Sequence, residues 1–195
     1  MINFRLATFI KSATKQSERP EKKLDEILFI GRSNVGKSSL INALCDNKSL
    51  CFTSSKPGHT RLLNYFEIKD QCYLVDAPGY GYSKAGKSHD LLFANMMEDY
   101  FADNNYLKLV VFLIDSRREI REDENEMFDI LNTDEIPYIV AMTKCDKLNQ
   151  SERHKMKQEI AKFSDLIKAD NVIFTSINNK KSIEELKKKI SDYIN

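Results

Sequence analysis

Short apolar segments alternate along the chain with longer segments in which apolar residues recur at helical spacing. The apolar segments are rich in Val, Ile, Leu and Phe and have the length of strands. They predict strands over residues 26–30, 61–68, 71–75, 108–114, 138–143 and 172–174. The segments with helical spacing predict helices over residues 37–46, 88–102, 122–132, 151–168 and 182–194.

Two of these strands, 61–68 and 71–75, are separated only by Lys69 and Asp70, which predicts a hairpin. Elsewhere strands and helices alternate as repeated β-α units. Such units form a mostly parallel sheet with helices on both faces, and ligands bind at the carboxyl ends of its strands. We therefore expect a three-layer α/β fold with one antiparallel edge hairpin.

Length and composition fit a single globular domain. The chain has 195 residues, and we expect the domain to span residues 24–195. Residues 1–23 are expected to be a polar lead-in, because 11–23 are polar and charged and contain Pro20. The longest apolar run, 109–114, is far shorter than the ~20 residues that span a bilayer. The start also lacks the features of a signal peptide, so we expect a cytoplasmic protein without membrane contact.

Charge and cysteine usage narrow the classes of partner and site. The net charge of +1 gives no overall basic field for DNA, and any RNA contact has to come from local patches. The cysteines form no CxxC pair and no Cys/His ligand spacing, which favours reduced structural thiols over zinc or a disulfide. They are Cys45, Cys51, Cys72 and Cys145.

The first predicted strand ends in a motif of the form GxxxxGK[ST], and a helix follows it directly. The glycines let successive backbone N–H groups point at phosphate oxygens, and the helix N-terminus adds unpaired donors. Lys37 is expected to reach the β- and γ-phosphates, and the Ser38 hydroxyl to bind Mg²⁺. The motif predicts a nucleoside triphosphate without identifying its base. The candidate residues are Gly31, Arg32, Ser33, Asn34, Val35, Gly36, Lys37, Ser38 and Ser39.

A second motif, DxxG, ends the strand after the predicted hairpin and comprises Asp76, Ala77, Pro78 and Gly79. A carboxylate at this point can hold the Mg²⁺ shell through water. The N–H of Gly79 can donate to the γ-phosphate, and a glycine lets that peptide reorient when the phosphate leaves.

Two further strand ends predict recognition of guanine. Thr143, Lys144 and Asp146 fit the pattern [NT]KxD. The Asp146 carboxylate can accept two hydrogen bonds from guanine N1–H and its exocyclic amine, whereas adenine offers neither donor on that edge. The stem of Lys144 suits packing along the base. The last strand ends in Phe174, Thr175 and Ser176, where a backbone N–H, expected to be that of Ser176, can meet guanine O6.

These motifs, taken together, resemble the EngB (YsxC/YihA) family of bacterial ribosome-biogenesis GTPases. The segments GRSNVGKSSLINAL, KPGHTRLLNYFEI, LVDAPGYGYSKAGK, LVVFLIDSRREIREDE, TKCDKL and FTS follow in the family's order from about Leu24 onward. GRSNVGKSSLIN with DAPGYGY is specific to this family. The resemblance implies a Ras-like G domain that binds GTP, GDP and Mg²⁺ and acts in assembly of the large ribosomal subunit.

The family correspondence also implies a switch threonine, Thr60, preceded by Gly58 and His59. Its hydroxyl and backbone are expected to meet Mg²⁺ and the γ-phosphate in the GTP state. The family more often has PGRTQ, so His59 and Arg61 depart from it. The family also commonly has SSxxxxG in its last motif, whereas Lys181 stands where that glycine is expected.

The residues around the motifs predict slow intrinsic hydrolysis. Tyr80 follows DxxG, where Ras-like enzymes use a glutamine to orient the attacking water. Neither Arg117 nor Arg118 can be assigned as an arginine finger. We therefore expect a partner or cation to stimulate turnover. Asn34 either resembles the asparagine with which potassium-dependent relatives hold K⁺ or shapes the loop through an unusual backbone angle.

Several basic segments are candidate contacts for ribosomal RNA, although charged runs are usually solvated. The segment 80–87 combines tyrosines, glycines and lysines, and its tyrosines could stack on RNA or pack onto the domain. The basic clusters comprise Lys11, Lys15, Arg19, Lys22 and Lys23, and Lys180, Lys181, Lys187, Lys188 and Lys189.

Three other functions stay open from the sequence. They are a signalling or trafficking GTPase, a small P-loop kinase that uses ATP, and a module that binds GTP without turnover. The first lacks support because no prenylation cysteine ends the chain, and TKCD argues against the second. Nothing in the sequence requires more than a monomer.

Overall fold

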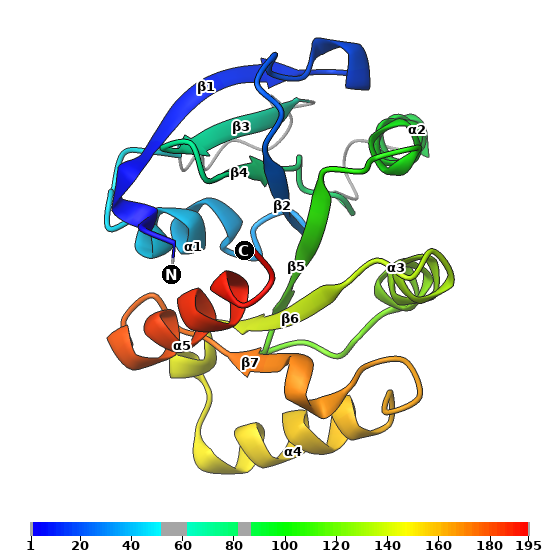
Figure 1. Ribbon diagram of the computed structural model, residues 1–195. Coiled ribbons are helices and arrows are strands. Elements are labelled where there is room, and N and C mark those ends of the chain that lie inside the picture. The colour runs from blue at the N-terminus through cyan, green and yellow to red at the C-terminus, as the bar shows by residue number, and fades with distance from the viewer. Residues whose placement is uncertain (1, 52–61, 82–86, 195) are drawn as a thin grey trace.

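The computed structural model describes residues 2–51, 62–81 and 87–194, with only the backbone for residues 87–90. Its strands form a seven-stranded sheet in the order β1-β3-β4-β2-β5-β6-β7 (Figure 1). Strand β3 runs antiparallel to its neighbours β1 and β4, and the strands from β4 to β7 in this order are parallel. The strands are β1 (Ala7–Ala13), β2 (Asp25–Gly31), β3 (Leu63–Ile68), β4 (Cys72–Asp76), β5 (Leu107–Asp115), β6 (Tyr138–Thr143) and β7 (Val172–Phe174).

Helices cover both faces of this sheet. Helices α1 and α5 lie on one face, and α2, α3 and α4 lie on the other (Figure 1). Each face has its own hydrophobic core, and the central parallel strands are buried from both sides, which is why they consist of unbroken apolar runs. None of the described helices is long and apolar enough to cross a membrane. The helices are α1 (Lys37–Leu44), α2 (Lys87–Phe101), α3 (Glu122–Thr133), α4 (Gln150–Ala161) and α5 (Lys180–Ser191).

The predicted α/β fold and its hairpin are confirmed, with most element ends within a few residues of expectation. One helix is shorter than predicted: α4 ends at Ala161, although the spacing predicted a helix to residue 168. After Ala161 the backbone closes into turns, in which Lys162 N–H donates to the Glu159 carbonyl at 3.1 Å. These turns bring Ile167, which is 2% exposed, into the core. Packing therefore overrides the local helical spacing.

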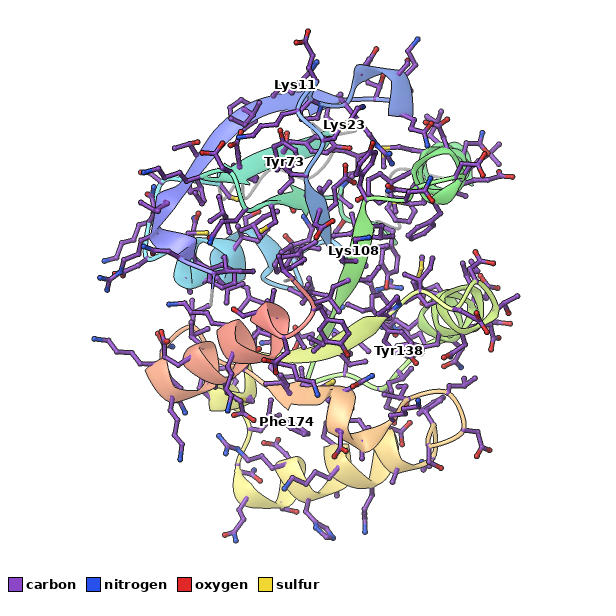
Figure 2. The ribbon with its side chains drawn as sticks, in the orientation of Figure 1. Lys11, Lys23, Tyr73, Lys108, Tyr138 and Phe174 are labelled. Atoms are coloured by element: carbon purple, nitrogen blue, oxygen red, sulfur yellow. The ribbon has the colours of Figure 1, made fainter. Side chains whose placement is uncertain are left out.

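The N-terminal segment contains a strand that the sequence did not predict. Strand β1 pairs with β3, from Ala7 opposite Ile68 to Ala13 opposite Leu63, so the hairpin β3–β4 has one more strand outside it. Of its residues only the two terminal alanines are buried, so the alternation of buried and exposed positions that marks a strand is missing. Figure 2 shows Lys11 at this edge and Phe174 near the opposite edge of the sheet.

Candidate functional site

The phosphate loop joins β2 to α1 at the carboxyl end of the sheet. Two residues turn it back on itself with left-handed backbone angles, Asn34 with φ 65° and Gly36 with φ 102°. Gly36 is also the N-cap of α1. Among the hydrogen bonds of the described residues, none uses the N–H groups of Gly36, Lys37 or Ser38. The loop therefore presents free donors at a helix N-terminus, which is the arrangement that binds phosphate.

Two charged side chains, one from α1 and one from β4, meet beside this loop. The Lys37 ammonium forms an ion pair with Asp76, at the end of β4, and both side chains are about 10% exposed. Ser38 lies in the first turn of α1, next to Lys37. Hydroxyl and carboxylate oxygens are the ligands that Mg²⁺ prefers, and a lysine beside them can neutralise phosphate charge. The predicted Mg²⁺ ligands Ser38 and Asp76 thus fit that ion.

The DxxG segment lies directly against the phosphate loop. After Asp76, the Ala77 N–H still donates to the Phe29 carbonyl at 3.0 Å, which continues the pairing of β4 with β2. The Ser33 N–H then donates to the Tyr80 carbonyl at 2.9 Å. A Cβ on Gly79 would lie 2.9 Å from the Cα of Ser33, so only glycine permits this approach. The phosphate loop and the DxxG segment are therefore in backbone contact.

The Tyr80 side chain points into the protein. Its ring lies between Phe93 and Phe112, with centroid distances of 5.4 Å and 6.5 Å, and the residue is 5% exposed. Burial raises the pKa of its phenol. The sequence left two roles open for the tyrosines, stacking on RNA or packing onto the domain. Tyr80 packs onto the domain. Tyr82 lies outside the described residues.

Arg32, the second residue of the phosphate loop, connects three segments. It forms an ion pair with Asp123 in α3, and its Nη2 donates to the Gly81 carbonyl at 3.2 Å. Its guanidinium also lies 5.9 Å from the centroid of the Tyr80 ring. The sequence placed Arg32 in the loop but gave no sign of these contacts, because its partners come from distant segments.

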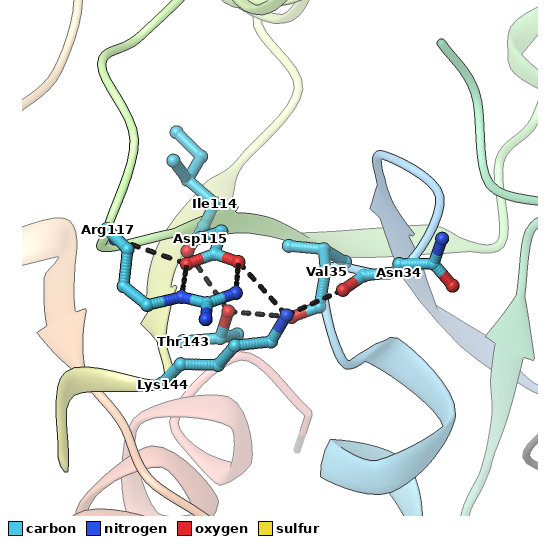
Figure 3. A network of polar contacts seen from close by, with 7 residues as sticks. All are labelled: Asn34, Val35, Ile114, Asp115, Arg117, Thr143 and Lys144. Atoms are coloured by element: carbon cyan, nitrogen blue, oxygen red, sulfur yellow. Dashed lines mark hydrogen bonds and ion pairs between the residues drawn. The ribbon is translucent and has the colours of Figure 1, made fainter. Parts of the chain in front are cut away.

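The base-reading motif at the end of β6 is tied to the phosphate loop (Figure 3). The Thr143 hydroxyl donates to the Val35 carbonyl at 2.8 Å. The next residue, Lys144, has a left-handed backbone with φ 59°, and its Nζ donates to the Asn34 carbonyl at 2.7 Å. Its stem passes over the loop, since a Cβ on Gly36 would meet the Lys144 Cε at 3.7 Å. The predicted residues of both motifs therefore form one site.

Asp115, at the end of β5, completes this network and was missed at the sequence level. It accepts hydrogen bonds from Lys144 Nζ at 2.9 Å and from Arg117 Nε and Nη2 at 2.9 Å and 2.7 Å. Burial alone raises the pKa of Asp115, but these donors outweigh it and hold the pKa below its usual value. A polar residue ending a buried parallel strand was the available signal.

The N–H expected to meet guanine O6 has a hydrogen-bond partner within the protein. The Ser176 N–H already donates to the Ser182 hydroxyl at 3.1 Å, and Thr175 and Ser176 are both buried. The N–H of the following residue, Ile177, forms no hydrogen bond within the described residues. Ile177 is exposed, so its N–H is the donor that this loop can present to a base. Ser182, in the first turn of α5, was not considered from the sequence.

Asp146 lies next to this loop. Its Oδ2 accepts a hydrogen bond from Asn178 Nδ2 at 3.2 Å. Hydrogen bonding from Ser176 and from Asn178 lowers the pKa of its carboxyl, so Asp146 is ionised at neutral pH. An ionised carboxylate is the acceptor that the guanine N1–H and exocyclic amine require.

Several other predicted site residues are not among those that form the site described above. Gly58, His59 and Thr60 lie outside the described residues, as does most of the segment 80–87. Phe174 lines a groove beside α4, away from the phosphate loop. The four cysteines are buried and form no disulfide.

Comparison with known proteins identifies the family. The profile of a family described as 50S ribosome-binding GTPase matches residues 26–144. The probable GTP-binding protein EngB of Mesoplasma florum is 43% identical over 182 residues, covering 90% of this chain and 88% of the relative. That of Prosthecochloris aestuarii is 39% identical over 187 residues, covering 96% of each.

Solved structures agree with these relatives. A crystal structure of a probable GTP-binding protein engB superposes with a TM-score of 0.70 at 26% identity, covering 86% of this chain and 97% of that one. Era in complex with MgGDPNP and nucleotides 1506–1542 of 16S ribosomal RNA superposes with a TM-score of 0.65 at 26% identity, covering 90% and 58%. The chain is thus a P-loop GTPase that belongs to the EngB family of GTP-binding proteins.

Proposed function

We propose that this GTPase is a switch protein with slow intrinsic hydrolysis that acts in the cytoplasm in assembly of the large ribosomal subunit. The observation that carries the ribosomal part is the match of residues 26–144 to a family described as 50S ribosome-binding GTPase. The similarity to Era bound to a 16S rRNA fragment lends further support to an RNA-containing partner. The kinase alternative falls because the family is one of GTP-binding proteins.

In this proposal the phosphate loop holds GTP or GDP. Lys37 and the free N–H groups of Gly36, Lys37 and Ser38 bind the phosphates, while Ser38, Asp76 and Thr60 hold Mg²⁺. Mg²⁺ supplies neutralisation of phosphate charge when bound. Asp146 and the Ile177 N–H read the guanine edge, and the Lys144 stem lies under the base. Binding of either nucleotide then biases the Gly79–Tyr80 segment that contacts Ser33.

Slow hydrolysis is expected because the described residues that could assist it are engaged in other contacts. Tyr80 is packed in the core and cannot orient water as a glutamine does, and Arg117 is engaged by Asp115. A partner or K⁺ is therefore needed to complete the site. Asn34 is exposed within the phosphate loop, so its side chain is available to K⁺. Its positive φ equally supports a role in shaping the loop. Equal turnover in NaCl and KCl at matched ionic strength would remove the K⁺ hypothesis.

The ribosomal role is tested by co-sedimentation with purified large subunits in potassium buffer. The protein is loaded with a non-hydrolysable GTP analogue or with GDP, and GTP turnover is read in parallel with and without subunits. We expect association in the GTP state that is much weaker in the GDP state, and faster turnover with subunits. Intact GTP binding without association in either state contradicts the proposed partner.

A further inference from the structure

A groove runs between the first turns of α4 and the end of β7, at the edge of the sheet. It has a volume of about 910 Å³. The groove adjoins the two base-reading loops, because α4 begins soon after Asp146 and Phe174 directly precedes Thr175. A ligand in this groove therefore lies next to the guanine-reading loops. The lining residues are Asn149, Gln150, Ser151, Arg153, His154, Lys157 and Phe174.

The lining of this groove is basic and contains no carboxylate. Arg153, His154 and Lys157 are exposed, and none of them forms an ion pair with another described residue. In a chain with 30 basic and 29 acidic residues, a concave surface lined by Arg153 and Lys157 and by no carboxylate is a local excess of positive charge.

Three members of the basic clusters that the sequence offered for RNA are bonded within the protein, whereas the other lysines of these clusters form no ion pair among the described residues. Arg19 donates to the Tyr100 carbonyl at 2.9 Å, and Lys22 pairs with Glu67 at 2.5 Å and with a second carboxylate. Lys187 pairs with Glu184 at 2.7 Å. A phosphate has to compete with these partners. In the α4 groove Arg153 Nη2 also has a partner, since it donates to the Cys145 carbonyl at 3.0 Å, but the other N–H groups of Arg153 and the Lys157 ammonium have no partner among the described residues.

An aromatic ring lies beside these cations. Phe174 is half-buried: it packs against the core on the α4 side and also lines the groove. It ends β7, the last strand of the sheet. An aromatic ring next to cations and to amide and hydroxyl groups is the combination that holds unpaired nucleotides, because bases stack on the ring and phosphates pair with the cations.

We propose that this groove binds single-stranded RNA, with a base stacked on Phe174 and phosphates held by Arg153 and Lys157. Gln150, Ser151 and the Nδ2 of Asn149 supply donors and acceptors for base edges, while the Asn149 Oδ1 accepts from the Glu152 N–H. That this RNA is ribosomal rests on the proposed function, whereas RNA binding by the groove does not. An acidic peptide is the competing ligand, since it uses the same cations, but it gains nothing from the aromatic ring.

The test measures binding of a short fluorescent single-stranded RNA to the full chain by anisotropy. We expect Arg153→Ala/Lys157→Ala to bind at least tenfold more weakly. Its slope of log Kd against log salt is expected to be smaller by about 1.4, at roughly 0.7 per phosphate contact on a single strand. Phe174→Leu, which keeps an apolar side chain, is expected to lose at least fivefold, in line with ~1–3 kcal/mol per stacked base.

Lys155→Ala is the matched control, since Lys155 lies on the same helix, is exposed and does not line the groove. It is expected to change affinity less than twofold, and Lys155→Ala and Phe174→Leu are expected to keep the wild-type affinity for GDP. No binding of RNA to the wild type, or equal binding by all variants, overturns the proposal. Displacement of the RNA by poly-glutamate with no effect of Phe174→Leu overturns it in favour of a protein ligand.

Co-sedimentation with large subunits separates this proposal from the proposed function. Groove variants that lose both the oligonucleotide and the subunit support both proposals. If wild type and variants sediment equally with large subunits, the groove proposal is overturned and the ribosomal role stands. If the wild type fails to associate with subunits while its oligonucleotide binding depends on the groove, the ribosomal role fails and the groove proposal stands.

Discussion

The Nζ of Lys144 lies 2.7 Å from the carbonyl oxygen of Asn34, so the residue expected under the base is bonded to the loop expected around the phosphates. Asp115 holds the same ammonium from the other side at 2.9 Å. The two halves of the nucleotide site thus share one lysine. Any change that releases Lys144 is expected to weaken binding of the whole nucleotide, whichever phosphates it carries.

Asp115→Asn tests this coupling. The substitution keeps the shape of the side chain but removes the charge that faces Lys144 and Arg117, so we expect GDP and GTP affinity to fall about tenfold, equivalent to ~1.4 kcal/mol. Stopped-flow dissociation of a fluorescent GDP measures the effect. The control is Asp70→Asn, which breaks an exposed ion pair with Lys22 on the hairpin and is expected to leave dissociation unchanged. Equal dissociation rates for wild type and Asp115→Asn contradict the coupling.

The same carboxyl predicts a pH dependence of stability. Because its pKa is held below the usual value, the folded state favours ionised Asp115. The resulting stabilisation is complete above the ordinary aspartate pKa of ~3.9 and is lost as the pH falls below it. The difference in free energy of unfolding between wild type and Asp115→Asn is therefore expected to be largest near neutral pH and to shrink in acid. Urea unfolding across this pH range provides the measurement, and a constant difference argues against the assignment.

Gly79→Ala probes the contact between the switch segment and the phosphate loop. The new Cβ would lie 2.9 Å from Ser33 Cα and 3.0 Å from Ser33 N, and backbone atoms cannot yield as a flexible side chain does. We expect the segment to move away, with at least tenfold slower GTP turnover and faster hydrogen exchange of the Ser33 amide. GDP affinity is expected to change little, because Gly79 is expected to contact the γ-phosphate only. Unchanged exchange at Ser33 shows that the close approach does not matter.

Two buried tyrosines are predicted to respond in opposite ways to loss of the hydroxyl. The Tyr80 hydroxyl has no hydrogen-bond partner among the described residues, so Tyr80→Phe is expected to be neutral or stabilising by up to ~1 kcal/mol. The Tyr100 hydroxyl donates to Glu26 at 2.6 Å, and Glu26 is 3% exposed. Tyr100→Phe is therefore expected to destabilise by about 1–3 kcal/mol. Urea midpoints compare them, and a similar loss in both contradicts the prediction.

Local patterns predicted most of the fold and the phosphate loop, because the buried strands and the GxxxxGKS motif are continuous in sequence. The sites that were missed depend on distant partners. Asp115 matters because Lys144 reaches it from the next strand, and the Ser176 N–H is occupied because Ser182 folds back from α5. Strand β1 likewise owes its form to pairing with β3, since its own residues lack alternation.

The two ends of the sheet have a consequence for how the molecules behave at high concentration. Strand β7 is only three residues long, and β1 carries a bulge between Phe9 and Lys11. A free strand edge recruits other chains only when it is long and regular enough to template a new ladder. Neither end of this sheet offers such a template, even though Phe9 is 54% exposed. Both edges of the sheet are therefore poor templates for pairing with another chain, which disfavours edge-to-edge aggregation.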